Sequence, residues 1–135
     1  MKLTDLAIGD LILINNTPHK IQAIDSIDAE ILADDELYYV GEDRCHSEDK
    51  IEGIPITPEI LEKNGFVFDC DFWTIANPRY NNVRMVRYCS IDEDVTDAFL
   101  GHWAFDENYA IDFVHELQHA LRLCGLNELA DNFKI

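Results

Sequence analysis

Positive charge is scarce in this sequence. The 135 residues contain 10 Lys and Arg against 27 Asp and Glu, which gives a formal net charge of −17 at pH 7. A chain this acidic is repelled by the phosphates of nucleic acids and by anionic lipid surfaces. The charge balance therefore predicts no direct nucleic-acid binding and no membrane partner.

Long apolar runs are missing as well. No stretch provides the roughly 20 apolar residues of a membrane-spanning helix. Residues 1–10 (MKLTDLAIGD) lack the basic region and apolar core of a secretory signal. No C-x-x-C pair occurs among the four cysteines, which are Cys45, Cys70, Cys89 and Cys124. We therefore expect reduced thiols and a cytoplasmic location.

The composition that is present, 47% hydrophobic and 27% charged, is that of a globular protein. In the first part of the chain, short apolar or alternating segments are separated by turn residues. They predict strands at residues 11–14, 20–24, 28–32, 37–40 and 50–54. So many short strands in so few residues predict an SH3-like barrel or small curled sheet over residues 1–55, and barrel closure would leave no open edges.

The pattern changes in the second part, residues 56–135. Thr57, Pro58 and Glu59 suit the start of a short helix, and Asn64-Gly65 suits its end. Strand patterns at residues 66–69, 72–76, 83–89 and 99–105 then predict an antiparallel meander. An amphipathic helix over residues 109–124 is expected to cover this sheet. The predicted fold class is therefore α+β.

One motif carries a specific chemistry. Residues 115–119 read His-Glu-Leu-Gln-His, the H-E-x-x-H pattern of zinc metallopeptidases. On a helix, His115 and His119 lie one turn apart on the same side, so both imidazoles can bind one zinc ion. Glu116 can then act as the general base on the zinc-bound water. A small zinc metallopeptidase is therefore one hypothesis for function.

The rest of such a zinc site is hard to find in the sequence. A catalytic zinc needs a third protein ligand. In the extended motif a glycine and a third histidine follow, but here Arg122 and Gly125 stand at those places. No spacing singles out one of the other candidates, which are His102, Asp106, Glu128 and Asp131. We therefore assign no catalytic, cofactor-binding or metal-binding residue, and keep zinc as the alternative.

The helical wheel of residues 109–124 also argues against the enzyme. Its apolar residues gather into one stripe, made of Ala110, Phe113, Val114, Leu117, Ala120, Leu121 and Cys124. His115 and His119 fall on the opposite side of the helix. Both are expected to lie in water as ordinary surface residues.

Acidic runs leave two interpretations open. Residues 25–52 contain eleven acidic residues and two basic ones. The simplest interpretation is a solvated surface. The sharper one is a nucleic-acid mimic, whose carboxylates imitate phosphates and occupy a DNA-binding protein. Residues 92–97 (DEDVTD) alternate oxygen ligands, but they lack the central glycine and final glutamate of an EF-hand loop.

Three segments resemble a family of small proteins encoded by gut anaerobic bacteria and by their phages and mobile elements. They are residues 1–10 (MKLTDLAIGD), residues 56–66 (ITPEILEKNGF) and residues 113–125 (FVHELQHALRLCG). The family has no established activity, and its tail often resembles VHQLQN. The resemblance therefore implies that Glu116 and His119 are not a family signature, and that the setting is bacterial and cytoplasmic.

These observations together predict a small acidic accessory protein of phage or mobile-element origin. Its expected role is non-catalytic, namely binding to a protein partner that the sequence does not identify. The zinc metallopeptidase and the nucleic-acid mimic are the alternatives.

Overall fold

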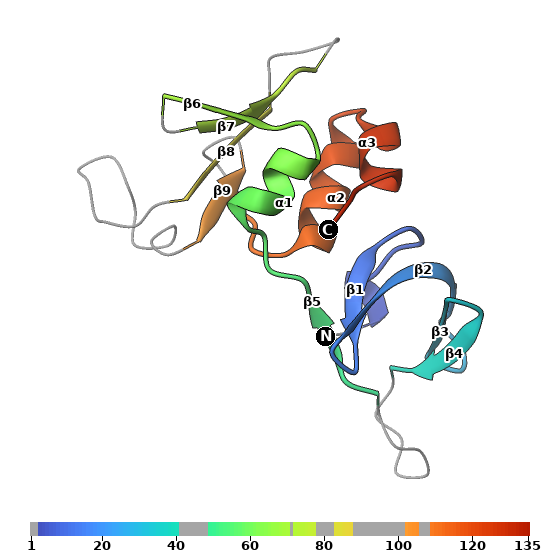
Figure 1. Cartoon of the computed structure of the whole chain (residues 1–135). Coiled ribbons are helices and arrows are strands. Elements are labelled where there is room, and N and C mark those ends of the chain that lie inside the picture. The colour runs from blue at the N-terminus through green and yellow to red at the C-terminus, as the bar shows by residue number, and fades with distance from the viewer. Residues whose placement is uncertain (1–2, 41–48, 71, 78–82, 88–101, 106–108) are drawn as a thin grey trace. The chain divides into compact units, whose positions relative to one another are not determined.

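The computed structural model describes residues 3–40, 49–70, 72–77, 83–87, 102–105 and 109–135 (Figure 1). The chain divides into two units, Met1–Ile54 and Pro55–Ile135. Each unit contains one five-stranded sheet, and neighbouring strands run antiparallel in both. Together with the α-helices of the second unit, these sheets confirm the α+β class.

In the Met1–Ile54 unit a short 3₁₀ helix, η1, precedes the sheet. The elements are η1 (Leu3–Asp5), β1 (Leu11–Ile14), β2 (Thr17–Asp25), β3 (Glu30–Ala33), β4 (Glu36–Tyr39) and β5 (Ile51–Gly53). The strands lie in the order β4-β3-β2-β1-β5. All five strands expected from the sequence are present, with ends that differ by a few residues.

Side chains along β1 and β3 alternate between the core and the outer face of the sheet. Ile12 and Ile14 on β1, and Ile31 and Ala33 on β3, are buried, while the residues between them are more exposed. Branched isoleucines suit both the extended backbone and the core that they fill. Asn15 and Asn16, between β1 and β2, have φ values of 51° and 69°. Asparagine tolerates this left-handed region, so the two residues form a tight hairpin turn.

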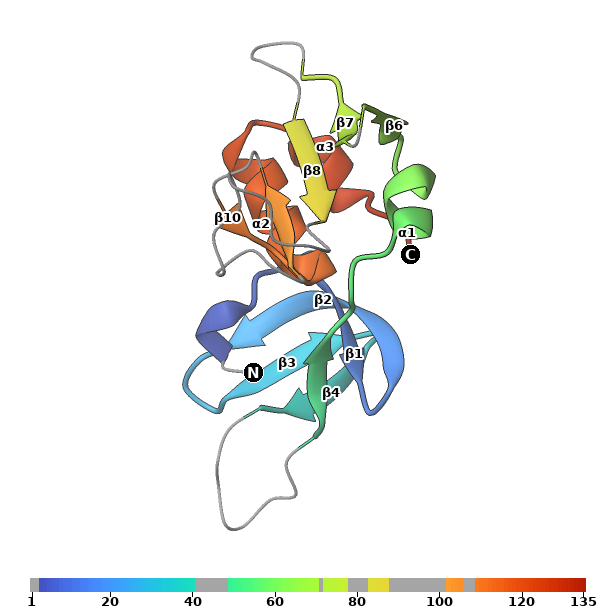
Figure 2. The same cartoon turned by 90° about the vertical axis from the view of Figure 1, so that its left-hand side faces the viewer.

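The predicted closed barrel is not what the structure shows. β2 is long, and its register with β3 shifts between Ile21 and Ala23, so one curved strand serves both halves of the sheet (Figure 2). Within the described ranges no strand pairing joins β4 to β5. Both strands are short. Asp49, just before β5, is hydrogen-bonded to Tyr39, the last residue of β4. The Oδ2 of Asp49 accepts from the N–H of Tyr39 (2.9 Å), and the N–H of Asp49 donates to the carbonyl of Tyr39 (3.2 Å).

In the Pro55–Ile135 unit the sheet is a meander of order β10-β9-β8-β7-β6, as predicted. Three helices lie on one side of it (Figure 1). The elements are α1 (Pro58–Lys63), β6 (Val67–Asp69), β7 (Phe72–Ile75), β8 (Val83–Arg87), β9 (Trp103–Phe105), β10 (Tyr109–Ala110), α2 (Val114–Leu123) and α3 (Asn127–Asp131).

The short helix α1 follows its sequence signals. The hydroxyl of Thr57 accepts from the N–H of Ile60 (3.2 Å), and Pro58 occupies the first helical position. Gly65 has a φ of 87°, a left-handed conformation that glycine adopts at little cost. Leu61 is fully buried. The predicted start and end of this helix are therefore confirmed.

The C-terminal part differs from the prediction at both ends. Residues 109–110 form the edge strand β10, because they pair with Phe105 and Ala104 of β9. The N–H of Ile111 also donates to the carbonyl of Trp103 (2.7 Å). The main helix therefore begins at Val114 and not at Tyr109. A further helix that the sequence analysis did not predict, α3, follows it.

A buried amide anchors the C-terminal residues of this unit. The Nδ2 of Asn64 donates to the carbonyls of Ile60 (2.7 Å) and Lys134 (2.8 Å), and its Oδ1 accepts from the N–H of Lys134 (2.7 Å). Asn64 ends α1, so one side chain joins that helix to the end of the chain. All of its hydrogen-bonding atoms are used in a largely buried position.

We expect Asn64→Ala to lower the free energy of unfolding by about 2–3 kcal/mol, because it leaves buried backbone groups without their partners. Chemical denaturation of the full chain measures this loss. Asn132→Ala is the matched control, since that exposed amide makes one local hydrogen bond to the carbonyl of Glu128 (2.9 Å). Equal losses for the two variants would contradict the anchoring role.

Candidate functional site

The start of α2 contains the glutamate of the H-E-x-x-H motif. The Oε1 of Glu116 accepts from the backbone N–H groups of Phe113 (3.1 Å) and Asp112 (3.3 Å). The first N–H groups of a helix have no partner within the helix, so this carboxylate supplies one. Its negative charge also lies at the positive end of the helix dipole. Glu116 therefore has a structural task in the helix that carries it.

Asp112, just before this helix, joins two further segments to it. Its carbonyl accepts from the N–H of Ile56 (2.9 Å). Its carboxylate oxygens lie 2.6 Å from the Nδ1 of His102 and 3.4 Å from the backbone nitrogen of Trp103. The indole N–H of Trp103 in turn donates to the carbonyl of Ile56 (3.1 Å). Three chain segments thus meet at the N-terminus of α2.

The prediction that both histidines of the motif lie in water is wrong for His115. Its side chain is 4% exposed, and that of His119 is half-buried. The buried residues of α2 are Val114, His115, Leu117, Gln118 and Leu121. At about 100° per residue, the centre of this buried side lies roughly 70° from the centre of the predicted apolar stripe.

The two imidazoles do lie together, as the spacing of the motif predicts. The ring centroids of His115 and His119 are 5.9 Å apart, and the planes are inclined by 79°. Two imidazoles on one zinc ion have centroids about 5 Å apart, given Zn–N bonds of about 2 Å. The ring of Phe113 stacks on that of His115, with centroids 6.0 Å apart. The distance between the two ring centroids is therefore about 1 Å longer than the distance at which both rings could bind one zinc ion.

A third ligand for these rings is not found in the part of the chain that the structure describes. There, no three His, Cys, Asp or Glu side chains gather into a group that could hold a metal ion. Among the sequence candidates, Asp131 lies 3.5 Å from Arg122, and Glu128 lies in the first turn of α3. Asp106 lies outside the described residues.

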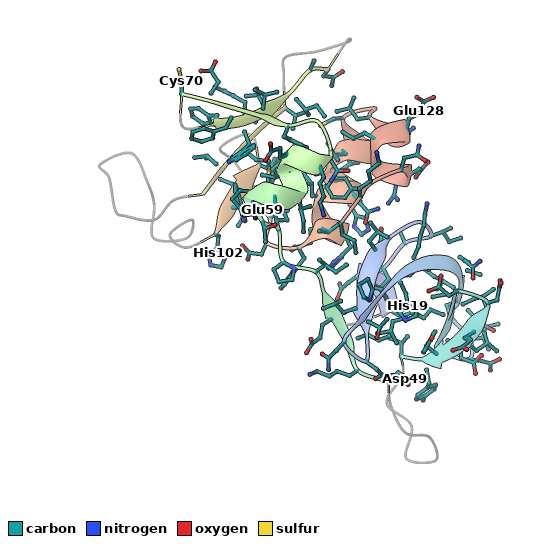
Figure 3. All side chains as sticks on the ribbon, in the orientation of Figure 1. His19, Asp49, Glu59, Cys70, His102 and Glu128 are labelled. Carbon is teal, nitrogen blue, oxygen red and sulfur yellow. The ribbon has the colours of Figure 1, made fainter. Side chains whose placement is uncertain are left out.

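His102, the remaining candidate, has a different partner. Its Nδ1 contacts Asp112, and the side chain points outward from the end of β9 (Figure 3). A carboxylate on Nδ1 fixes the orientation of an imidazole and leaves Nε2 for other contacts. His102 and Asp112 are ten residues apart in the sequence, and the antiparallel pairing of β9 with β10 brings them together. The sequence contained no periodic signal for this pair.

Several other features that the sequence analysis considered fall outside the described ranges. These are Cys45, Cys89 and the acidic residues 92–97. Cys70 is exposed, and Cys124, expected in the core, is partly exposed at the end of α2. The carbonyl of Cys124 accepts from the amide of the buried Asn77 (3.1 Å). The two described cysteines thus contribute no ligand group.

Comparison of the chain with protein-family models, with curated proteins and with solved structures finds no match. In the described part of the chain, no helix has both the length and the apolar character needed to cross a bilayer. The function of the protein is therefore inferred from the geometry of the chain itself.

If Glu116 serves mainly as a helix cap, its replacements should differ in stability. We expect Glu116→Ala to lower the free energy of unfolding by about 1–2 kcal/mol, and Glu116→Gln by clearly less, because the amide oxygen can still accept the backbone N–H groups. Urea unfolding of the full chain provides the measurement.

The matched control is Glu128→Ala, which removes an exposed carboxylate from the first turn of α3. We expect a loss of only a few tenths of a kcal/mol there. Unchanged stability in Glu116→Ala would show that the carboxylate does not hold the helix start.

Proposed function

We propose that this chain is a non-catalytic protein that acts by binding another protein. The observation that carries the proposal is the exposure of large apolar side chains on ordered strands in both units. Leu37 on β4 is 67% exposed, and Val67 and Phe68 on β6 are 64% and 57% exposed. Large apolar side chains that stay exposed on ordered strands are a feature of surfaces that associate with other proteins.

The geometry of the H-E-x-x-H motif supports the same proposal. Its glutamate accepts from two backbone N–H groups, and its first histidine is buried beside Phe113. Both residues thus have roles in the fold that require no catalysis. The close approach of His115 and His119 keeps zinc binding as the alternative that experiment must separate.

The carboxylates of the Met1–Ile54 unit also have local roles. Asp25 accepts from the N–H groups of Ile27 (2.9 Å) and Asp28 (3.1 Å), and His19 forms an ion pair with Asp34. Acidic residues that hold turns require no phosphate mimicry to account for them. A protein-binding role therefore agrees better with these contacts than a nucleic-acid mimic.

We also propose a fold type for the first unit and a cellular origin for the protein. The strand order β4-β3-β2-β1-β5, with a long bulged β2 shared by both halves, supports an SH3-like arrangement of the first unit. The acidic charge and the family resemblance support a cytoplasmic protein of phage or mobile-element origin.

Crosslinking in the organism that encodes this protein tests the proposal directly. We expect the tagged chain to capture the same protein in repeated experiments, identified by mass spectrometry. An unrelated acidic protein of similar size and charge is the control, and it should not capture that protein. Repeated failure to recover any specific protein would contradict the binding role.

Metal analysis separates the proposal from the peptidase alternative. We expect untagged protein to contain far less than one zinc per chain, and we expect His119→Ala to leave that metal content unchanged. A single bound zinc per chain that His119→Ala removes would instead support a metallopeptidase, because the two rings need each other to hold the ion.

A further inference from the structure

A row of apolar side chains crosses the outer face of the first sheet. Ala23 on β2 lies opposite Leu32 on β3, and Leu32 lies opposite Leu37 on β4. Directly opposite residues share one face of a sheet, and Ile31 and Ala33 point to the other face, into the core. We call Ala23, Leu32 and Leu37 the apolar row. Ala23 and Leu37 are exposed, and Leu32 is half-buried.

Negative charge lies on both sides of this row, at the two ends of β3. Residues 21–40 contain six carboxylates and no Lys, Arg or His, which gives this segment a formal charge of −6 at pH 7. The six belong to the two turns that flank β3 and to the adjoining strand ends: Asp25, Asp28, Glu30, Asp34, Asp35 and Glu36. Figure 3 shows oxygen-tipped side chains around the β3–β4 end of this unit.

Further apolar surface lies near the row, because Ile27, in the turn between β2 and β3, is 91% exposed. Tyr38 is not part of this surface. It lies opposite Ile31 of β3 and packs against the core, on the other face of β4 from Leu37. Its hydroxyl donates to Glu36 (3.0 Å), and desolvation, this hydrogen bond and the nearby carboxylates raise the pKa of Tyr38.

Charge complementarity restricts what can cover this face. Nucleic acid and anionic lipid carry the same sign of charge as the turns, so both are repelled. A second copy of this chain, with its net charge of −17, is repelled as well. A protein segment with Lys or Arg on either side of apolar side chains matches both the row and the acidic turns that flank it. Opposite charges steer the encounter, and burial of apolar side chains supplies the affinity.

We propose that the apolar row and its acidic turns form the docking site for a protein segment whose apolar side chains are flanked by Lys or Arg. This inference rests on the proposed protein-binding function and names the chemistry of its partner. We expect Leu37 to make the largest contact, since it is the most exposed large side chain of the row.

Fluorescence anisotropy with synthetic peptides and the full chain tests the inference. The first peptide alternates Leu and Lys, the second replaces each Lys by Glu, and the third replaces each Leu by Ser. We expect only the Leu/Lys peptide to bind, with an affinity that falls as salt is added, because salt screens the attraction between exposed charges.

Variants identify the surface that binds. We expect Leu37→Ser to weaken binding of the Leu/Lys peptide about tenfold, which corresponds to burial of one exposed leucine. Leu123→Ser is the matched control, because Leu123 is a leucine that is 90% exposed and lies on α2 of the other unit. We expect Leu123→Ser to leave binding unchanged, and both variants to keep the wild-type Tm.

A second pair of variants tests the charges. The double variant Asp28→Asn/Glu30→Gln should weaken binding several-fold and reduce its dependence on salt. Glu62→Gln, an exposed carboxylate on α1, should change neither. Together with the leucine variant, this pair separates the apolar contribution to binding from the electrostatic one.

Several results would overturn the inference. They are absence of binding to the Leu/Lys peptide, equal binding of the Ser/Lys peptide, unchanged binding in Leu37→Ser, and equal weakening by Leu123→Ser. If crosslinking still recovers a specific protein with the Leu37→Ser chain, the docking site is wrong and the binding function stands. If no protein is recovered and the chain holds zinc, the proposed function itself fails.

Discussion

The partners of a few backbone N–H groups at the start of α2 determine the arrangement of the Pro55–Ile135 unit. The carboxylate of Glu116 accepts from Phe113 and Asp112, and the carbonyl of Asp112 accepts from Ile56. Phe113 also forms a bridge with Pro55. The first N–H groups of a helix have no partner within it, so these contacts hold the point at which α2 begins. The rotation of α2 about its axis decides which motif residues are buried.

That rotation explains why the sequence analysis misplaced His115. The helical wheel summed apolar residues and included Ala110, which belongs to the strand β10. It also left out Gln118, which is polar. Gln118 is fully buried because its amide donates to the carbonyl of Ala130 on α3 (2.9 Å). A hydrophobicity pattern cannot anticipate a polar side chain that is satisfied by a helix elsewhere in the chain.

Local signals in the sequence were reliable where the structure they specify is itself local. Thr57, Pro58 and Asn64 mark the ends of α1, and Asn15-Asn16 forms the turn that its composition predicts. Barrel closure was different, because it depends on whether β4 and β5, which residues 40–50 separate, pair with each other, and no local signal specifies that pairing. The contact between His102 and Asp112 also depends on pairing across strands. Neither could be derived from residue order and composition.

The carboxylates on both sides of Leu32 and Leu37 also lie where local sequence signals place turns. Asp34 and Asp35 have φ values of 49° and 63°, and aspartate is one of the few residues that tolerate this conformation in a hairpin turn. β3 is four residues long, so the turns at its ends are separated by roughly 13 Å. The middle of β3 is therefore about 7 Å from each turn, which is within the Debye length of about 8 Å at physiological salt, so both turns act on whatever contacts the strand between them. Turn-forming residues and a short strand are therefore sufficient to place an exposed apolar row within a negative field.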